Sequence, residues 1–327
     1  MARAMTQISK SWIVNESGKL PEIRDLPISP PGSSEVRIRV ATTGLNFADL
    51  LMIKGTYQAT PPLPFAPGME VAGLIEGVGA DVRDLVPGDR VTAVTGSGGL
   101  ASHVNVAASN VLKVPRKMSD VEAAGFQVVY GTSHLALTRR AHLQSGETLV
   151  VLGASGGVGL TAVEVGHALG ARVIAVARGE KKLEVARAAG ADVLIDSDAP
   201  DLLGAFREHG PIDVAYDAVG GAAGEAALRA LAPEGRFVVI GFASGDVPAL
   251  KANHLMVKNQ TVIGIYWGGY REFNRAALTD SLSELLEWYE QGKIRPHISH
   301  VLPFERALEG LDLLRSRKAT GKVVITQ

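Results

Sequence analysis

The sequence contains no cysteine, and this absence removes several classes of function at once. A chain without thiols forms no disulfide, no thiolate zinc site, no iron–sulfur cluster and no cysteine nucleophile. It also lacks any apolar run of about 18 residues, so no membrane-spanning helix is expected. The first 20 residues are polar and do not read as a secretory signal. Together these features predict a cytoplasmic protein.

An excess of charge of one sign is missing as well. Lysine and arginine number 33 against 34 aspartate and glutamate residues, for a formal net charge of −1. This balance gives no electrostatic reason to expect nucleic acid or a membrane surface as a partner. Glycine, by contrast, is plentiful at 37 of 327 residues, as in chains with many tight turns. The composition is typical of a globular chain long enough for two domains.

Two different patterns follow one another along the chain. In the first third, short alternating segments such as 35–40 are separated by turn signals such as Val86-Pro87-Gly88-Asp89. This pattern favours a compact β-rich unit. Further on, continuous apolar segments at 148–152 and 172–177 enclose a helical pattern at 158–169. Apolar strands that alternate with helices predict a doubly wound parallel sheet.

A glycine-rich turn lies between the first of these strands and the helix that follows it. Small residues there let a backbone approach a pyrophosphate, and the helix N-terminus offers free N–H groups. A purely structural turn is the alternative, but the strand–turn–helix context favours a dinucleotide site. The turn residues predicted to bind the cofactor are Ser155, Gly156, Gly157, Val158 and Gly159.

The end of the second strand indicates which dinucleotide is bound. NAD-binding proteins usually carry an acidic residue there, about 20 residues after the turn, to hold the ribose hydroxyl. Here the strand ends in Ala177, and Arg178 and Lys182 follow. A cation would pair with a 2′-phosphate, so the sequence predicts NADPH as the cofactor. The alternative is a solvated helix start, although cations are unfavourable at a helix N-terminus.

Several motifs together identify a family resemblance that covers nearly the whole chain. They are Asn46-Phe47-Ala48-Asp49, Pro67-Gly68-Met69-Glu70, Pro87-Gly88-Asp89-Arg90, Tyr130-Gly131-Thr132 and Thr320-Gly321-Lys322. With the cofactor turn, they make the chain resemble the medium-chain dehydrogenase/reductase superfamily, and within it the zinc-free quinone oxidoreductases. The stretch 264–270 resembles the branch called quinone oxidoreductase-like protein 2.

The resemblance implies an α/β architecture of two domains. A GroES-like β-rich catalytic domain would span residues 1–127 and be completed by 267–327, and a Rossmann NADPH-binding domain would span 128–266. A homodimer is expected. In zinc-dependent relatives, a cysteine and a histidine would stand where this chain has Asn46 and Met69. No catalytic zinc is therefore expected.

The absence of zinc favours acceptors that delocalise the incoming hydride charge themselves, such as quinones and activated alkenes. We therefore expect NADPH:quinone oxidoreductase activity. One alternative is reduction of activated C=C bonds in enones or 2-haloacrylates. Another is a cofactor-binding structural protein, since lens zeta-crystallin belongs to the same family.

The resemblance also supplies candidate site residues, each with a simpler reading. Asn46 and Tyr57 would face the acceptor, although the first could cap a turn and the second could line a wall. Tyr130 could instead serve interdomain packing. The pair His297 and His300 is not expected to bind metal, because residues three apart on a strand point to opposite faces. The remaining predicted cofactor contacts are Tyr130, Thr132, Gly241, Phe242 and Tyr266.

Overall fold

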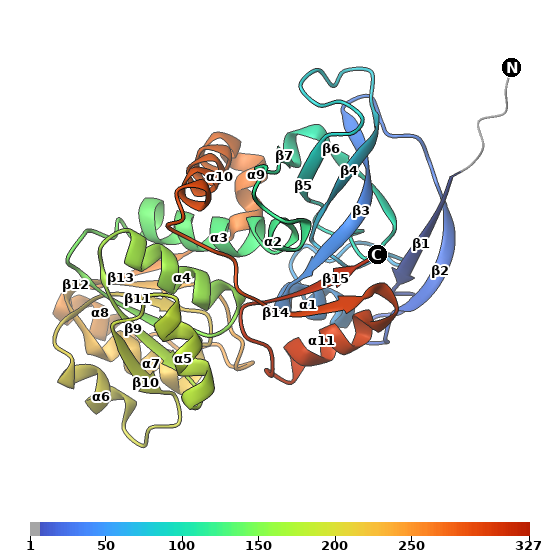
Figure 1. Cartoon of the computed structure of the whole chain (residues 1–327). Helices are drawn as coiled ribbons and strands as arrows, with labels where there is room; N and C mark the ends of the chain where they lie inside the picture. The colour runs from blue at the N-terminus through green and yellow to red at the C-terminus, as the bar shows by residue number, and fades with distance from the viewer. Residues whose placement is uncertain (1–6) are drawn as a thin grey trace, which may run out of the picture. The chain divides into compact units, whose positions relative to one another are not determined.

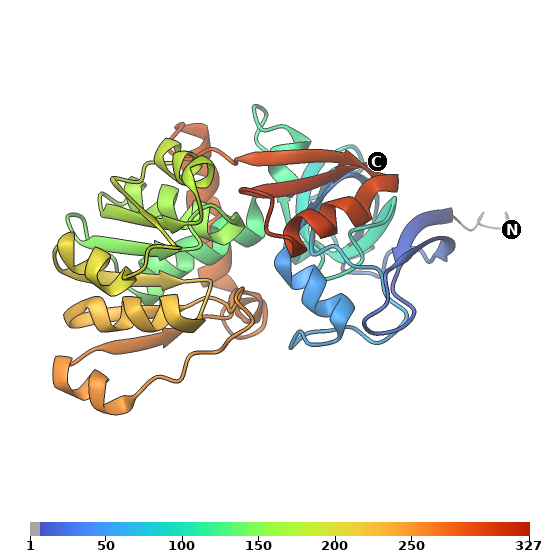
Figure 2. The ribbon, with the colours of Figure 1, turned by 90° about the horizontal axis from the view of Figure 1, so that it is seen from below.

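In the computed structural model, which describes residues 7–327, the chain folds as two units (Figures 1 and 2). The first unit combines the chain up to Val128 with Pro296–Gln327. The second is the continuous segment Val129–Arg295. The first is rich in strands and the second alternates strands and helices, as the two sequence patterns predict.

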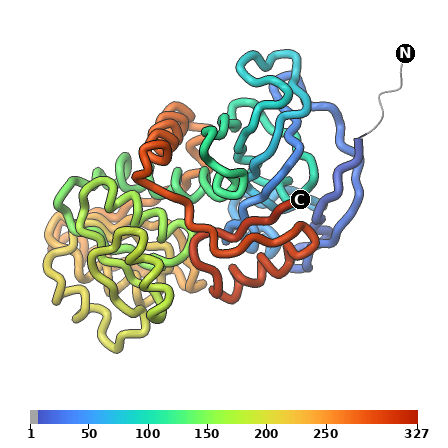
Figure 3. Tube along the Cα trace, viewed as in Figure 1, coloured from blue at the N-terminus to red at the C-terminus, as the bar shows by residue number. Residues whose placement is uncertain are grey.

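The first unit is built on a seven-stranded sheet with a separate hairpin of β1 (Gln7–Ile13) and β2 (Glu22–Ile28). The last strand of the chain pairs antiparallel with β3, so segments from the two ends of the sequence lie side by side in one sheet (Figure 3). The sheet order is β14-β15-β3-β4-β5-β7, with β6 paired to β3. The bounds are β3 (Glu35–Leu45), β4 (Glu70–Val78), β5 (Arg90–Val94), β6 (His103–Ala107), β7 (Val111–Lys113), β14 (Ile298–Pro303) and β15 (Lys322–Thr326).

The helices of the first unit are α1 (Phe47–Lys54), α2 (Asp120–Ala124) and α11 (Ala307–Arg315). The first and last of them cover an apolar cluster that includes Leu45 and Val323. A second cluster lies among the inward-facing residues of β3, β4 and β5. Burying two such clusters supplies the hydrophobic stabilisation of this unit.

The second unit is a six-stranded parallel sheet in the order β10-β9-β8-β11-β12-β13. This is the strand order of a Rossmann fold, so the predicted doubly wound sheet is confirmed. All five residues of β8 (Thr148–Leu152) are buried, as a central parallel strand requires. The other strands are β9 (Arg172–Ala177), β10 (Val193–Asp196), β11 (Ile212–Asp217), β12 (Leu231–Val239) and β13 (Thr261–Gly264).

The helices of this unit agree closely with the sequence pattern. The helix expected at 158–169 is α4 (Gly157–Ala168), and the longest helix of the unit is α10 (Arg275–Glu290). The others of at least five residues are α3 (Gln127–His134), which begins at the end of the first unit, α5 (Glu180–Ala188), α6 (Leu202–Glu208), α7 (Gly221–Ala230) and α8 (Ala252–Lys258). No helix in the part of the chain that the structure describes has both the length and the apolar character needed to span a membrane.

One assignment differs from the sequence analysis. Residues 267–295 were expected to complete the first domain, but they lie in the second unit. There α10 packs on α3, with the His134 ring edge-on to Trp288 and its Nδ1 2.8 Å from the Ser281 hydroxyl. Amphipathic periodicity in a sequence indicates that a helix buries one face, but not against which element.

Candidate active site

The glycine-rich turn lies between β8 and α4, as predicted. The Ala154 N–H donates to the carbonyl of Val176 in β9 at 3.0 Å, which fixes the turn on the sheet. Gly156 is the N-cap residue of α4, and no side chain caps this helix within residues 7–327. The first N–H groups of α4 are therefore suited to bind an anion such as a pyrophosphate.

A side chain would be excluded for different reasons at Gly159 and at Gly156. A Cβ atom at Gly159 would lie 2.1 Å from the carbonyl oxygen of Gly153, so a side chain there would push helix and turn apart. A Cβ at Gly156 would meet that same oxygen at 3.4 Å, an ordinary contact. Since the protein itself leaves room at Gly156, the glycine fits a close approach by a bound dinucleotide.

Arg178 and Lys182 follow the carboxyl end of β9. Arg178 is exposed, and its Nε lies 3.0 Å from Oδ1 of Asp198, a residue that the sequence analysis did not single out. Lys182 is half-buried in the first turn of α5. Both cations therefore lie at the carboxyl end of the sheet, Arg178 just before α5 and Lys182 in its first turn.

Gly241, Phe242 and Tyr266 come shortly after the carboxyl ends of β12 and β13. Phe242 and Tyr266 are exposed, and Gly241 donates its N–H to the carbonyl of Asp217 at 3.2 Å. All strands of the sheet are parallel, so these residues lie at the carboxyl ends of the strands, as the glycine-rich turn does. Ligands of doubly wound folds bind at this edge.

Tyr130 and Thr132 lie in α3, and both are buried. The Tyr130 hydroxyl donates to Oε2 of Glu164 on α4 at 2.5 Å, and the Arg295 N–H donates to the other carboxyl oxygen at 3.0 Å. Burial raises the pKa of Glu164 to about 7. The ring of Tyr130 is fully enclosed, so the structure favours a packing role over a contact with the cofactor.

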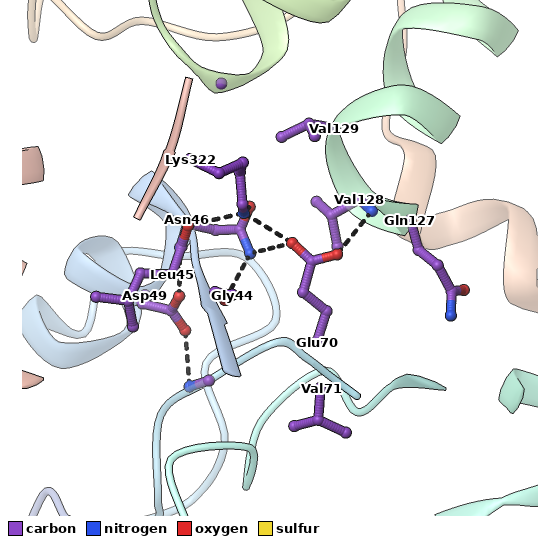
Figure 4. Close-up of polar contacts among 12 residues, drawn as sticks. Gly44, Leu45, Asn46, Asp49, Glu70, Val71, Gln127, Val128, Val129 and Lys322 are labelled. Carbon is purple, nitrogen blue, oxygen red and sulfur yellow. Dashed lines mark hydrogen bonds and ion pairs between the residues drawn. The ribbon is translucent and has the colours of Figure 1, made fainter. Parts of the chain in front are cut away.

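A buried polar cluster surrounds Asn46 at the start of α1 (Figure 4). The Lys322 ammonium donates to Oε1 of Glu70 at 2.7 Å, to Oδ1 of Asn46 at 2.8 Å and to the carbonyl of Leu45 at 2.8 Å. The Asn46 amide donates to the same Glu70 oxygen at 3.0 Å and to the carbonyl of Gly44 at 3.3 Å. Lys322 is 4% exposed and Glu70 is fully buried, so the ion pair is cut off from water.

These contacts change the interpretation of Asn46. Its two amide hydrogens and its oxygen all have partners within the first unit. The polar amide in an apolar motif does need a partner, but Glu70 and Lys322 supply it. Asn46 could contact an acceptor only by giving up one of these bonds. Lys322 and Glu70 were not predicted as site residues, although each lies inside a recognised motif.

Asp49 completes the cluster on its far side. Its carboxylate accepts the N–H groups of Asn46 and Gly68, each at 2.8 Å, and so ties the start of α1 to the loop before β4. Burial raises the pKa of Asp49 to about 6, and the two backbone N–H groups act in the opposite direction. The carboxylate holds the backbone around Asn46 in place.

Tyr57 and Met69 both belong to the apolar side of this region. Met69 is a buried member of the cluster around Leu45, and Tyr57 is half-buried against that cluster. Of the two roles considered for Tyr57, this position agrees better with a residue that lines the wall of the site than with a proton donor. The two histidines at the start of β14 contact different neighbours, Thr320 for His297 and Ser299 for His300. Within residues 7–327 no three His, Asp or Glu side chains are grouped so as to hold a metal ion.

Comparisons with known proteins agree with this geometry. Residues 32–116 match the family described as alcohol dehydrogenase GroES-like domain, and residues 157–283 match the one described as zinc-binding dehydrogenase. The chain is 39% identical to quinone oxidoreductase-like protein 2 of Bos taurus over 311 residues, which cover 94% of this chain and 88% of the bovine protein. A homologue of that protein from Nematostella vectensis is 37% identical over 97% of this chain and 88% of its own length.

Solved structures give the same result. The quinone oxidoreductase of Thermus thermophilus, solved also with NADPH, is 35% identical with a TM-score of 0.85, over 97% of this chain and 100% of that one. The Escherichia coli quinone oxidoreductase, solved with NADPH, is 27% identical with a TM-score of 0.89. The match covers 98% of this chain and 100% of the Escherichia coli chain.

Fold and site thus define a medium-chain dehydrogenase/reductase, a nicotinamide-dependent oxidoreductase. Within that superfamily the chain belongs to the quinone oxidoreductase family. The family predicted from the sequence motifs is confirmed.

Proposed function

We propose that this protein is a zinc-independent NADPH:quinone oxidoreductase, acting as a homodimer as the family resemblance implies. One observation carries the proposal: the dinucleotide turn of α4 is followed, at the end of β9, by Ala177 and the exposed Arg178. A cation at this position favours a cofactor with a 2′-phosphate. Relatives that are named quinone oxidoreductases and were solved with NADPH add support.

The residues around Asn46 do not fit a catalytic zinc ion. A zinc ion there would need nitrogen, sulfur or carboxylate ligands that are free to bind it. Here the Lys322 ammonium already lies between Asn46 Oδ1 and Glu70 Oε1, and Met69 is part of the apolar core. A second cation beside this lysine would be repelled.

A site without zinc favours acceptors that can be reduced without a Lewis acid. When bound, NADPH would supply the hydride, and the protein would orient the acceptor and exclude water. A quinone spreads the charge of the added hydride over its conjugated system and can take the one remaining proton from water afterwards. The reaction then requires neither a metal ion to polarise the acceptor nor the half-buried Tyr57 to donate a proton. We place Tyr57 at the wall of the acceptor site.

Turnover on a panel of acceptors tests the proposal. We expect NADPH oxidation with quinones to exceed that with enones and 2-haloacrylates, and to survive exhaustive treatment with a strong chelator. Elemental analysis should find no stoichiometric zinc. Faster turnover of the alkenes would identify an alkene reductase instead. Binding of NADPH without turnover of any acceptor would support a structural protein, and activity lost to the chelator and restored by zinc would refute zinc independence.

The cofactor preference is tested by Arg178→Ala. Charge-assisted hydrogen bonds contribute about 1.5–3 kcal/mol, so the Michaelis constant for NADPH should rise roughly tenfold or more. The constant for NADH should stay nearly unchanged, because NADH has no 2′-phosphate. Arg187→Ala, at an exposed residue in the last turn of α5, is the control. Equal affinity of the unmutated protein for both cofactors would show that the preference does not exist.

A further inference from the structure

The loops that follow β9 and β10 meet at one edge of the parallel sheet. Asp196, the last residue of β10, is paired in register with Ala177, the last residue of β9. The Ser197 N–H then donates to the carbonyl of Ala177 at 3.0 Å. This register brings Asp198 beside Arg178, although the two are 20 positions apart in the sequence.

The loop that carries Asp198 is held by backbone contacts. One carboxylate oxygen of Asp196 accepts the Asp198 N–H at 3.0 Å, and the other accepts the Gly179 N–H at 3.2 Å. Asp196 therefore ties the two loops together through its own side chain. The Asp198 carboxylate is left to contact the Arg178 guanidinium at 3.0 Å.

This ion pair contributes little to stability. The side chains of Arg178 and Asp198 are 66% and 59% exposed, and ion pairs of this kind are weak in water. Its effect on a ligand is larger than its effect on the fold, because it places a negative charge where a phosphate would have to approach. A dianionic 2′-phosphate would compete with the carboxylate for the guanidinium and would be repelled by it.

We propose that Asp198 is a specificity-determining residue that weakens binding of the 2′-phosphate and so sets the ratio of the affinities for NADPH and NADH. This inference rests on the proposed function, in which Arg178 binds that phosphate. Binding of NADPH exchanges the Arg178–Asp198 pair for an Arg178–phosphate pair. NADH leaves the pair intact, since its adenosine ribose carries only hydroxyl groups.

Asp198→Asn isolates this effect, because it removes the charge and keeps the shape of the side chain. Fluorescence titration of the full chain with each cofactor should show NADPH bound roughly three- to tenfold more tightly and NADH unchanged. Asp280→Asn, at an exposed position on α10, removes the same charge elsewhere and should change neither affinity. The gain for NADPH should shrink at about 0.5 M salt, as expected for exposed charges.

The double variant Arg178→Ala/Asp198→Asn separates the inference from the function it rests on. If Asp198 acts by competing for Arg178, its substitution should have a smaller effect once the arginine is gone. An unchanged or weaker NADPH affinity in Asp198→Asn, or equal tightening of both cofactors, would overturn the role of Asp198. If Arg178→Ala still loses NADPH affinity in that case, the proposed cofactor preference stands. If Arg178→Ala changes nothing, the preference itself is wrong.

Discussion

Replacing Lys322 with methionine should lower the free energy of unfolding of the first unit by about 3–5 kcal/mol. The Lys322 ammonium and the Glu70 carboxylate are 2.7 Å apart and buried. Methionine fills a similar volume but leaves the carboxylate without a cation, and a buried charge that loses its partner is strongly destabilising. Native-state hydrogen exchange in β3, β4 and β15 measures this free energy without assuming that both units unfold together.

Two comparisons separate this charge effect from simple loss of packing. Lys54→Met makes the same chemical change at an exposed position of α1 and should stay within about 0.5 kcal/mol of the unmutated protein. Adding Glu70→Gln to Lys322→Met should restore more than half of the lost stability, because no uncompensated charge then remains buried. A double variant as unstable as Lys322→Met alone would show that the ammonium matters for another reason.

The elements of the fold could be predicted because their signals are local. The strands β8 and β9 have the predicted bounds, 148–152 and 172–177, because each is an almost continuous run of apolar residues. The turn between β8 and α4 was recognised for the same reason: strand, glycines and helix are consecutive. The placement of α10 was not predicted, because its apolar face is compatible with either unit until His134 and Trp288 are seen together.

The contacts that define the site are the ones the sequence could not reveal. Lys322 reaches Asn46 across 276 positions of the chain, and Arg178 meets Asp198 only through the register of two neighbouring strands. The motifs named Asn46, Glu70 and Lys322 separately, but not that their three side chains meet. A lysine in an otherwise apolar strand was the available signal, since a lysine is rarely buried without a partner.

Helix α4 joins the cofactor turn to both ends of the second unit. Near its N-terminal end, the Thr161 hydroxyl donates to the carbonyl of Val129, where the chain enters this unit. One turn further on, the Glu164 carboxylate accepts the N–H of Arg295, where the chain leaves it. Tyr130 adds a bond to the same carboxylate. Glu164 thus connects three segments that are distant in sequence.

The protonation of Glu164 should make the second unit less stable as the pH rises. Burial raises the pKa of this carboxyl from 4.5 to about 7 in the folded protein. Between these two values the folded state holds a proton that the unfolded state has released. Stability is therefore greatest below pH 4.5 as far as this group is concerned, falls as the pH rises towards 7, and stays low above it. The full loss is about 3 kcal/mol.

Glu164→Gln should remove this pH dependence, because the amide has no proton to lose in this range. Glutamine can still accept the Arg295 N–H, although it offers Tyr130 a different hydrogen bond, so a constant offset between the proteins is expected. The informative quantity is how the difference in melting temperature changes between pH 5 and pH 8, measured by scanning calorimetry. From pH 5 to pH 8, the melting temperature of the glutamine variant should rise relative to that of the unmutated protein by roughly 5–10 °C. Glu225→Gln, at an exposed position of α7, should follow the unmutated protein at both pH values. If Glu164→Gln shows the same pH dependence as the unmutated protein, Glu164 is ionised throughout this range and its contacts to Tyr130 and Arg295 are those of a carboxylate.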